Sequence, residues 1–278
     1  MPDLDYDPAA HYDHVTAAWQ MLLGDELHYG VFTTGEEPLA TATAELTTRM
    51  IDAAQLEAGL DVLDVGCGSG APACRLARDF GVRVLGITTS TVGVAEATAR
   101  AAAEGLDGAQ FELRDGTDNQ LPDASFDRVW VLESSHLMRE RHRLLAECAR
   151  VLRPGGRLVL CDLIRHRDIP FDEVRERRAD FVTLRTAFGE AHFESLDFYA
   201  TGLQQHGLVV ERSDDLTQAT LPTFDRWRAN AEQHRSAVVA AIGADGHEAF
   251  VRSCDILEGL WRDGTFGYGL LAASKPTL

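Results

Sequence analysis

The middle of the chain alternates between short apolar runs and longer stretches with helical periodicity. The short runs, such as "DVLDVGCG" and "RLVLCDLI", are rich in aliphatic and β-branched residues, which is typical of buried strands. The stretches between them include "APACRLARDF" and "RHRLLAECARVL", and the second ends at the stop signal "RPGG". Strands that alternate with helices in this way predict right-handed crossovers and a parallel sheet.

The alternation runs from residue 61 to residue 164, and the pattern then changes. Residues 165–205 are first charged and then rich in aromatic side chains, which predicts two or three helices outside the repeat. Near the C-terminus, two strands without an ordinary helical crossover indicate a mixed sheet edge. Strands are expected at 61–68, 83–89, 109–115, 126–133, 157–164, 208–216 and 264–275. Helices are expected at 12–23, 40–54, 71–80, 91–106, 141–152 and within 215–262.

The composition narrows the class of protein. Of 278 residues, 45% are apolar and 25% are charged, which is typical of a globular chain that buries a sizeable core. The net charge of −18 disfavours binding to nucleic acid or to an anionic membrane, and its simplest consequence is solubility. Five scattered cysteines, an acidic N-terminus unlike a signal peptide and the lack of a long apolar run predict a cytoplasmic protein without a membrane span.

The stretch "DVGCGSG", from Asp64 to Gly70, follows a predicted strand and begins a predicted helix. Its glycines allow a tight turn and the close approach of a ligand. A P-loop is excluded because no G-K-S/T follows. A dinucleotide site stays open, since Gly66 and Gly68 are followed by Ala71 at the third position of that fingerprint. S-adenosylmethionine suits Asp64 better, because a carboxylate repels a pyrophosphate but attracts an ammonium group.

Motifs in a fixed order now indicate a family. "VLDVGCGSG", "VLGITTS", "LPDASFDRVWVLESSHLM" and "ARVLRPGGRLVLCDLI" resemble the successive motifs of class I S-adenosylmethionine-dependent methyltransferases. "LPDASFD" and "LRPGG" are the specific parts, and "AAWQMLLGDELHYGVF" and "FGYGLLAASKP" extend the resemblance to most of the chain. Within the family the chain is similar to the natural-product branch that includes the rebeccamycin sugar O-methyltransferase and tocopherol C-methyltransferases.

The resemblance implies a Rossmann-like α/β fold with a seven-stranded, mostly parallel sheet and helices on both faces. It divides the chain into an N-terminal helical cover (1–55), a cofactor-binding core (56–164), a helical lid inserted after the fifth strand (165–205) and a C-terminal completion of the sheet (206–278). It also implies that S-adenosyl-L-methionine is the cofactor and S-adenosyl-L-homocysteine the product. A small-molecule acceptor is the expected partner, and a homodimer is one assembly among those that the sequence leaves open. No metal site is expected, because no H-E-x-x-H motif or cysteine pair occurs.

The resemblance also places the cofactor contacts. The glycine loop of such enzymes holds the methionine end of the cofactor, which implicates Asp64, Gly66, Gly68 and Gly70. The second strand ends in "GITTS" without the acid that usually takes the ribose hydroxyls, so hydroxyl groups would replace it without charge assistance. This departure also weakens the dinucleotide interpretation, which needs an acid for the same task. The further contacts implied are Thr88, Thr89, Asp115, Gly116, Leu132, Glu133, Tyr12 and Tyr29.

Three of these contacts have a purely structural alternative. Asp115 is otherwise a turn residue or a helix cap, and Tyr12 and Tyr29 are otherwise packing aromatics. These alternatives stay open at the level of sequence.

The run "VLESSHLM", residues 131–138, begins on the fourth strand. Ligands bind outside the carboxyl ends of parallel strands, so Ser134, Ser135 and His136 are expected to face the acceptor. Rebeccamycin-type enzymes have a matching histidine and then a second one, where this chain has Leu137. Histidine suits a base because its ordinary pKa is about 6.5. Asp162, after the fifth strand, would orient His136 or act itself; the alternatives are a structural ring and a capping carboxylate.

Residues 165–205 supply the candidate contacts to an acceptor. Their aromatic side chains either wall an apolar pocket or pack only within the segment. The candidates are Phe181, Phe188, His192 and Phe193. A basic cluster of Arg175, Arg177 and Arg178 is either a solvated helix face or a clamp for an anionic acceptor such as a prenyl diphosphate.

The sequence thus predicts methyl transfer to a small, largely apolar natural product by in-line displacement, with His136 as the base. Whether O, N or C is methylated stays open, and C-methylation of an isoprenoid diphosphate or an indole-type carbon is one alternative. Cyclopropane synthesis on lipids is disfavoured, because "LHYGVF" stands where those enzymes have a "Y-S-C-A-Y-F"-like run. A cofactor-binding protein that has lost transfer and an NAD oxidoreductase are the remaining alternatives.

Overall fold

The computed structural model describes residues 18–277, which form two compact units. The helical unit consists of residues 18–46, Ile164–Phe193 and Leu216–Gly267, and the sheet unit consists of Thr47–Leu163, Glu194–Asp215 and residues 268–277. The units differ from the four predicted segments. Residues 194–205 belong to the sheet unit, and residues 216–267 belong to the helical unit.

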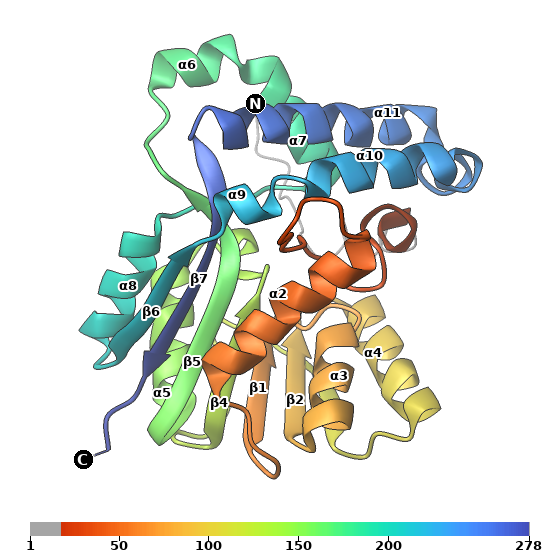
Figure 1. Ribbon diagram of the computed structural model, residues 1–278. Helices are drawn as coiled ribbons and strands as arrows, with labels where there is room; N and C mark the ends of the chain where they lie inside the picture. The colour runs from red at the N-terminus through yellow and green to blue at the C-terminus, as the bar shows by residue number, and fades with distance from the viewer. Residues whose placement is uncertain (1–17, 278) are drawn as a thin grey trace. The chain divides into compact units, whose positions relative to one another are not determined.

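Within the part of the chain that the structure describes, seven strands form one sheet in the order β3-β2-β1-β4-β5-β7-β6 (Figure 1). The pairs β1–β2, β2–β3, β1–β4 and β4–β5 are parallel, whereas β6 is antiparallel to β7. The predicted Rossmann-like sheet with a mixed edge is therefore confirmed. The strands are β1 (Asp61–Val65), β2 (Arg83–Thr88), β3 (Ala109–Leu113), β4 (Phe126–Leu132), β5 (Leu152–Arg165), β6 (Val209–Asp215) and β7 (Phe266–Ser274).

The helices beside the parallel strands begin at signals that the sequence carries. α3 begins after Gly70, which has a left-handed backbone (φ 77°). α4 begins after Ser90, whose hydroxyl accepts a hydrogen bond from the Gly93 N–H at 2.9 Å. The fifth strand is longer than predicted, because it begins at Leu152 and includes the "RPGG" motif. These helices are α2 (Leu39–Ala54), α3 (Ala71–Phe80), α4 (Thr91–Glu104), α5 (Arg141–Val151) and α8 (Leu196–Gln205).

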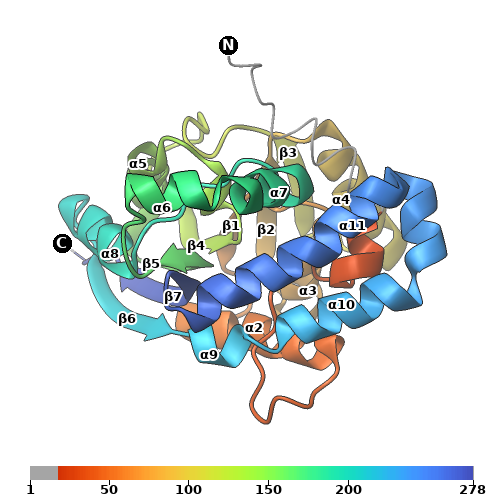
Figure 2. The same cartoon turned by 90° about the horizontal axis from the view of Figure 1, so that it is seen from above.

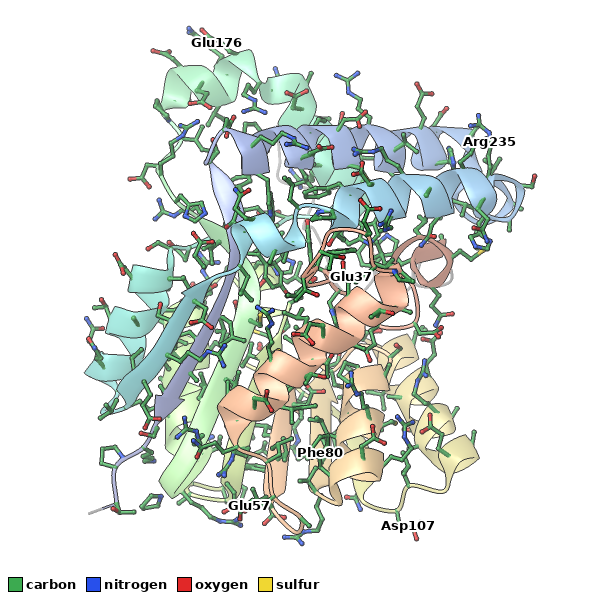
Figure 3. All side chains as sticks on the ribbon, viewed as in Figure 1. Glu37, Glu57, Phe80, Asp107, Glu176 and Arg235 are labelled. Atoms are coloured by element: carbon green, nitrogen blue, oxygen red, sulfur yellow. The ribbon has the colours of Figure 1, made fainter. Side chains whose placement is uncertain are left out.

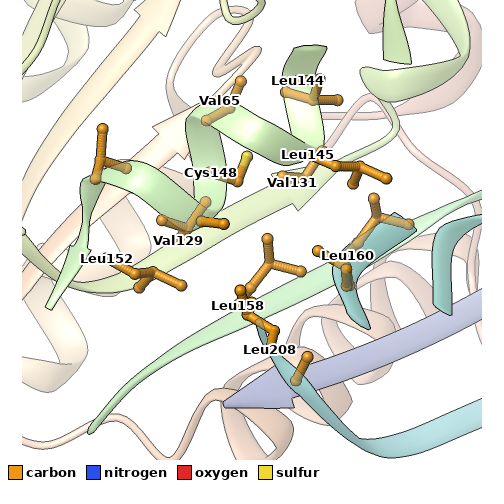
Figure 4. Packing of buried hydrophobic residues seen from close by; sticks show 14 of the residues in the cluster. Val65, Val129, Val131, Leu144, Leu145, Cys148, Leu152, Leu158, Leu160 and Leu208 are labelled. Carbon is orange, nitrogen blue, oxygen red and sulfur yellow. The ribbon is translucent and has the colours of Figure 1, made fainter. Parts of the chain in front are cut away.

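One face of the sheet packs against α5 and α8, and α3 lies on the opposite face (Figure 2). Alternate residues of β4 and β5 point to the α5 side, as the period of a strand requires. Buried side chains of the strands and of α5 meet there in one apolar cluster (Figure 4). Its labelled members are Val65, Val129, Val131, Leu144, Leu145, Cys148, Leu152, Leu158, Leu160 and Leu208. Burial of this cluster stabilises the sheet unit.

The helical unit has its own aromatic core. α7 and α10 lie on either side of α11, which is broken at Gly243 (Figure 2). The rings of Tyr29 and Trp261 are stacked with centroids 5.5 Å apart, and Trp227 and Phe224 meet Tyr29 edge-on. No helix of the described residues is long and apolar enough to cross a membrane. The helices are α6 (Phe171–Glu176), α7 (Arg178–Phe188), α9 (Thr217–Thr220), α10 (Thr223–Gln233) and α11 (Arg235–Arg262).

A loop in the helical unit is organised by one carboxylate, Glu37, which lies beside the start of α2 (Figure 3). Its Oε1 accepts hydrogen bonds from the hydroxyl of Thr33 at 2.6 Å and from the N–H groups of Thr33 and Thr34 at 3.0 and 2.8 Å. Its Oε2 accepts one from the Gly35 N–H at 3.0 Å. These bonds, the one from the Thr33 hydroxyl first, lower the pKa of Glu37 to about 2.

The Glu37 loop predicts an acid-sensitive contribution to stability. Because the pKa of Glu37 is lowered on folding, its contribution is present above the ordinary value of 4.5 and is lost as the pH falls towards 2. Glu37→Gln should lower the unfolding temperature at neutral pH, and this difference from the unmodified protein should shrink across that window. Thermal unfolding at a series of pH values measures it.

Glu36→Gln is the matched control, because the Glu36 side chain is exposed and only its backbone N–H bonds within the loop. It should leave the unfolding temperature unchanged. An equal effect of the two substitutions at neutral pH would show that the Glu37 carboxylate does not hold the loop.

Candidate functional site

The glycine loop connects β1 to α3 in the sheet unit. Gly66, Gly68 and Gly70 all have left-handed backbones, with φ of 81°, 52° and 77°, which glycine adopts at little cost. A Cβ at Gly66 would overlap the side chain of Ser134, whereas nothing lies within 4 Å of a Cβ at Gly68. Gly66 is therefore needed for close packing of the loop, and the backbone around Gly68 is open to a ligand.

Asp64 lies at the base of this loop and is only 2% exposed. Its Oδ2 is buried and has no hydrogen-bond partner. Burial raises the pKa of Asp64 to about 7, because no neighbouring charge or donor compensates the lost hydration. A buried carboxylate of this kind is poised to receive a cationic group of a ligand.

The ends of β2 and β3 carry the other predicted cofactor contacts. The hydroxyl of Thr88 accepts a hydrogen bond from the Ser90 N–H at 3.2 Å, and the Thr89 side chain is exposed. Oδ1 of Asp115 accepts bonds from the N–H and the hydroxyl of Thr117, each at 2.8 Å. Asp115 is therefore a turn residue, as its structural alternative states, and the turn leaves it exposed at the rim.

Gly116 is buried below this turn, against β1. A Cβ there would lie 2.6 Å from Cγ1 of Val65. The turn after β3 is therefore held close to the strand that leads into the glycine loop.

The run after β4 interlocks with the glycine loop. The buried hydroxyl of Ser134 donates to the Val65 carbonyl at 2.7 Å. Glu133 has a left-handed backbone (φ 46°), which is strained for a residue with a side chain, and its N–H donates to the Cys161 carbonyl at 2.9 Å. Its carboxylate accepts a 2.5 Å hydrogen bond from the hydroxyl of Tyr268. Glu133 is thus fixed through both its backbone and its side chain, and the side-chain bond was not predicted. Leu132 is buried at the end of β4.

His136 and Asp162 form a buried pair. Leu132 and Cys161 are opposite each other in the register of β4 and β5, so the residues that follow them come together. His136 lies in the short helix η1 (Ser135–Leu137), and its Nδ1 is 2.6 Å from Oδ1 of Asp162. Its N–H donates to Oδ2 of the same carboxylate at 3.1 Å. The backbone and the ring of His136 are therefore both fixed by Asp162.

Each member of this pair stabilises the charged form of the other. Burial alone would lower the pKa of His136, but the charge of Asp162 and the hydrogen bond to it outweigh this effect and raise it above the ordinary 6.5. Burial would likewise raise the pKa of Asp162, and the charge of His136 with the hydrogen bonds from His136, Ser135 and Leu163 lowers it. Asp162 therefore stays ionised and holds a proton on the Nδ1 side of the imidazole.

Ser134 was expected to face an acceptor, but its hydroxyl is bound to the Val65 carbonyl. Ser135 was expected to do the same, but it is buried and hydrogen-bonded inside the sheet unit. Its side chain is 0% exposed, and its hydroxyl lies 2.5 Å from Oδ2 of Asp162 and 2.8 Å from the hydroxyl of Tyr199. The reason is that Ser135 begins η1, which turns its side chain into the sheet unit. Tyr199 lies 64 residues after Ser135, and no sequence signal links the two residues.

The predicted residues of the helical unit are mainly in packing positions. Tyr29 is 3% exposed within the aromatic core, and its contact with the cofactor stays a prediction. Phe188 packs against Phe250 with ring centroids 5.7 Å apart, and Phe193 meets Phe266 edge-on at 4.6 Å. Phe181 and His192 are half-buried, and the His192 ring lies 3.3 Å from a Glu190 carboxylate oxygen. Contact of any of these side chains with an acceptor stays a prediction, and Tyr12 lies outside the described residues.

Two members of the basic cluster, Arg175 and Arg177, pair with acids of the same unit. Arg177 lies within 4 Å of carboxylates of Glu173, Asp180 and Asp263. Arg175 pairs with Asp172 at 3.3 Å. The solvated-face alternative therefore fits better than a clamp for a diphosphate, because Arg175 and Arg177 already have carboxylate partners.

The residues at the carboxyl ends of β1 and β2 fit S-adenosylmethionine. The unpartnered Oδ2 of Asp64 would take the ammonium of the methionine end, and the open backbone at Gly68 would receive its chain. Thr88 and Thr89 offer hydroxyls where an acid is missing. In residues 18–277 no group of three or more His, Cys, Asp or Glu side chains is arranged to hold a metal ion.

Comparisons with known proteins extend this assignment. The chain is 36% identical over 273 residues to the 27-O-demethylrifamycin SV methyltransferase of Amycolatopsis mediterranei, covering 95% of each chain. It is 33% identical over 270 residues to the methyltransferase GfsG of Streptomyces halstedii, covering 96% of this chain and 93% of GfsG. The solved structure of the cyclase SpnF is 26% identical with a TM-score of 0.83, covering 97% of this chain and 96% of that one.

The family model described as mycolic acid cyclopropane synthetase matches residues 5–263, which is most of the chain. The relatives from Amycolatopsis mediterranei and Streptomyces halstedii, which match nearly the whole chain, are both named methyltransferases. The chain therefore belongs to the mycolic acid cyclopropane synthetase family of class I S-adenosylmethionine-dependent methyltransferases.

Proposed function

We propose that this methyltransferase transfers the methyl group of S-adenosylmethionine to a hydroxyl group of a small, largely apolar natural product. The observation that carries the proposal is the buried His136–Asp162 pair, in which Nδ1 and Oδ1 are 2.6 Å apart. A histidine whose Nδ1 is held by a carboxylate is the arrangement of a general base. A hydroxyl acceptor requires such a base, because it must lose its proton when the new bond forms.

The glycine loop and Asp64 would hold the methionine end of the cofactor, and Thr88 and Thr89 would lie towards the ribose. When bound, S-adenosylmethionine supplies an electrophilic methyl group on a sulfonium. The left-handed backbone at Gly66, Gly68 and Gly70 lets the loop approach its ligand closely. The N-terminus of α3 directs free N–H groups towards the same place, which favours a carboxylate there.

His136 would take the proton of the acceptor hydroxyl. Asp162 keeps the Nδ1 side of the ring protonated, so the opposite nitrogen is the one that accepts. As the proton arrives, the imidazole becomes cationic and the buried carboxylate stabilises that charge. The single histidine of "VLESSHLM" therefore carries the base role with Asp162 as its partner, and Leu137 in place of a second histidine does not remove it.

The relatives support an oxygen acceptor. The name of the relative from Amycolatopsis mediterranei gives an O-demethylated rifamycin as its acceptor. C-methylation of an isoprenoid diphosphate is less favoured, because Arg177 is already paired with acids. A cytoplasmic location and a homodimer stay predictions.

A screen of hydroxylated acceptors tests this function. The protein is incubated with S-adenosylmethionine labelled with carbon-13 in its methyl group and with O-demethylated natural products, 27-O-demethylrifamycin SV among them. Mass spectrometry detects the transferred methyl group, and NMR shows whether the labelled carbon is bonded to oxygen. A labelled methyl on carbon would favour the C-methylation alternative, and cyclised product without label would point to a reaction like that named for SpnF.

Binding of S-adenosylhomocysteine should depend on pH through Asp64. The ammonium of the ligand favours the ionised carboxylate, so affinity should fall as the pH falls through about 7, the raised pKa of Asp64. The loss should approach about tenfold per pH unit below that value. Calorimetric titration of the full chain at several pH values measures it, and Asp64→Asn should bind weakly with little pH dependence.

Asp61→Asn is the matched control, because Asp61 begins the same strand but is paired with Arg83. It should keep the pH dependence of the unmodified protein. An affinity that does not change with pH in the unmodified protein would exclude Asp64 as the ammonium partner.

The pH profile of turnover should report the His136–Asp162 pair. Because the pKa of His136 is raised, kcat/KM for the acceptor should fall as the pH drops through a value above 6.5, where the ring becomes protonated and cannot act as a base. Asp162→Asn removes the attraction and leaves burial, so this decline should move to lower pH. The rate at high pH should also fall by about 10²- to 10⁴-fold.

Asp127→Asn serves as the control, because Asp127 begins β4 at the opposite end of the sheet and pairs with Arg153. It should leave the position of the decline unchanged. If Asp162→Asn also left it unchanged, the decline would not belong to His136.

A further inference from the structure

We infer that Ser135 and Tyr199 are positioning residues that act on the proposed base through Asp162, as a hydrogen-bonded chain from Tyr199 to Ser135 to Asp162 to His136. The inference rests on the proposed function, and neither Ser135 nor Tyr199 is expected to touch the acceptor or the cofactor. These four residues all lie in the sheet unit, and their hydrogen bonds join α8, η1 and β5.

The direction of each hydrogen bond follows from the carboxylate. An ionised Asp162 can only accept, so the single proton of the Ser135 hydroxyl must point to Oδ2, 2.5 Å away. The Tyr199 hydroxyl, 2.8 Å from Ser135 Oγ, must then donate to it. Burial and the nearby charge of Asp162 raise the pKa of Tyr199, so the phenol keeps the proton that this direction requires. Donors aligned in one direction strengthen each other.

Hydrogen-bond donors compensate the lost hydration of the buried Asp162 carboxylate. A carboxylate with 0% exposure would take up a proton unless donors replaced its hydration. The Leu163 N–H and His136 Nδ1 reach Oδ1 at 2.7 and 2.6 Å, and the His136 N–H and Ser135 hydroxyl reach Oδ2 at 3.1 and 2.5 Å. One of these four donors, the Ser135 hydroxyl, also lies 2.8 Å from the hydroxyl of Tyr199. Ser135 therefore links the charge of Asp162 to Tyr199.

Tyr199 is held firmly enough to orient the chain. It is fully buried on α8 in the apolar cluster of the sheet unit. At Gly202, one turn further along α8, a Cβ would crowd the side chain of Leu145 on α5, so the two helices approach closely. The N-cap Ser195, whose hydroxyl accepts from the Phe198 N–H at 3.1 Å, fixes the start of α8. The hydroxyl of Tyr199 thus has little freedom to leave Ser135.

The charges predict the direction in which loss of each residue changes the pKa of His136. Ser135 withdraws negative charge from Asp162 by donating to it, and Tyr199 strengthens that donation. If the Ser135 hydroxyl is removed, Asp162 keeps more of its charge for His136 and holds the imidazolium more strongly. Loss of Asp162 itself has the opposite effect, because burial alone disfavours the charged ring. A residue that only filled space would leave the pKa of His136 unchanged.

The test is the pKa of the His136 ring, measured by NMR on the full chain with labelled histidine. The chain has 10 histidines, so the His136 signal is assigned from its disappearance in His136→Gln. Ser135→Ala should raise the His136 pKa by about half a unit or more, and Tyr199→Phe should raise it by less. Asp162→Asn should lower it. Calorimetric binding of S-adenosylhomocysteine to each variant confirms that the site is folded.

Ser134→Ala is the matched control, since this neighbouring buried serine donates to the Val65 carbonyl instead of Asp162. It should leave the His136 pKa unchanged. If Ser135→Ala and Tyr199→Phe behave like Ser134→Ala while Asp162→Asn lowers the pKa, the positioning chain is overturned and the His136–Asp162 pair stands. If Asp162→Asn has no effect either, the base in the proposed function fails as well. If Ser135→Ala does not fold, the His136 pKa of Tyr199→Phe tests the same hydrogen-bonded series.

Discussion

The buried carboxylate of Asp162 is the constraint on which the candidate site depends. A charge with 0% exposure is unstable in a protein interior unless it is compensated. Four donors surround it, two from backbone N–H groups and two from the side chains of Ser135 and His136. Meeting this requirement fixes η1 on the end of β5, and through Ser135 it also fixes Tyr199 of α8. The orientation of the His136 ring follows from the same requirement.

The topology of the sheet explains why the proposed base lies beside the cofactor loop. β1 and β4 are parallel neighbours, so the loops that follow them leave the same edge of the sheet. Ser134 joins these loops by donating to Val65, and Gly66 is a glycine because any side chain there would overlap Ser134. The run "VLESSHLM" and the glycine loop are thus joined directly at Ser134. Two carboxylates at this edge of the sheet differ in kind, since Asp64 has an unpartnered oxygen and Asp162 is fully satisfied.

Much of this arrangement could be predicted from the sequence, because it follows from local pattern. The strand runs and the glycine loop that begins a helix are signals within a few residues of each other. The contact of His136 with Asp162 follows from two neighbouring parallel strands that end in register. The mixed sheet edge was likewise readable from two late strands without a crossover.

The remaining features depend on tertiary packing and could not be predicted. Ser135 was expected to face the acceptor, but one turn of η1 after the strand directs its hydroxyl inward. Tyr199 lies in a segment that resembled a lid, and its role depends on how α8 approaches α5 at Gly202. The bond between Glu133 and Tyr268 joins residues 135 positions apart, for which a single sequence holds no signal.

The central claim is that His136 is the base for a hydroxyl acceptor and that Asp162 holds it in place. Single-turnover methyl transfer by His136→Ala, with and without added imidazole, tests this most directly, using the acceptor that the methylation screen identifies. The account predicts a rate about 10²- to 10⁴-fold below that of the unmodified protein, with partial recovery as free imidazole base is added. A His136→Ala rate equal to that of the unmodified protein would contradict it and would show that positioning alone is sufficient for the transfer.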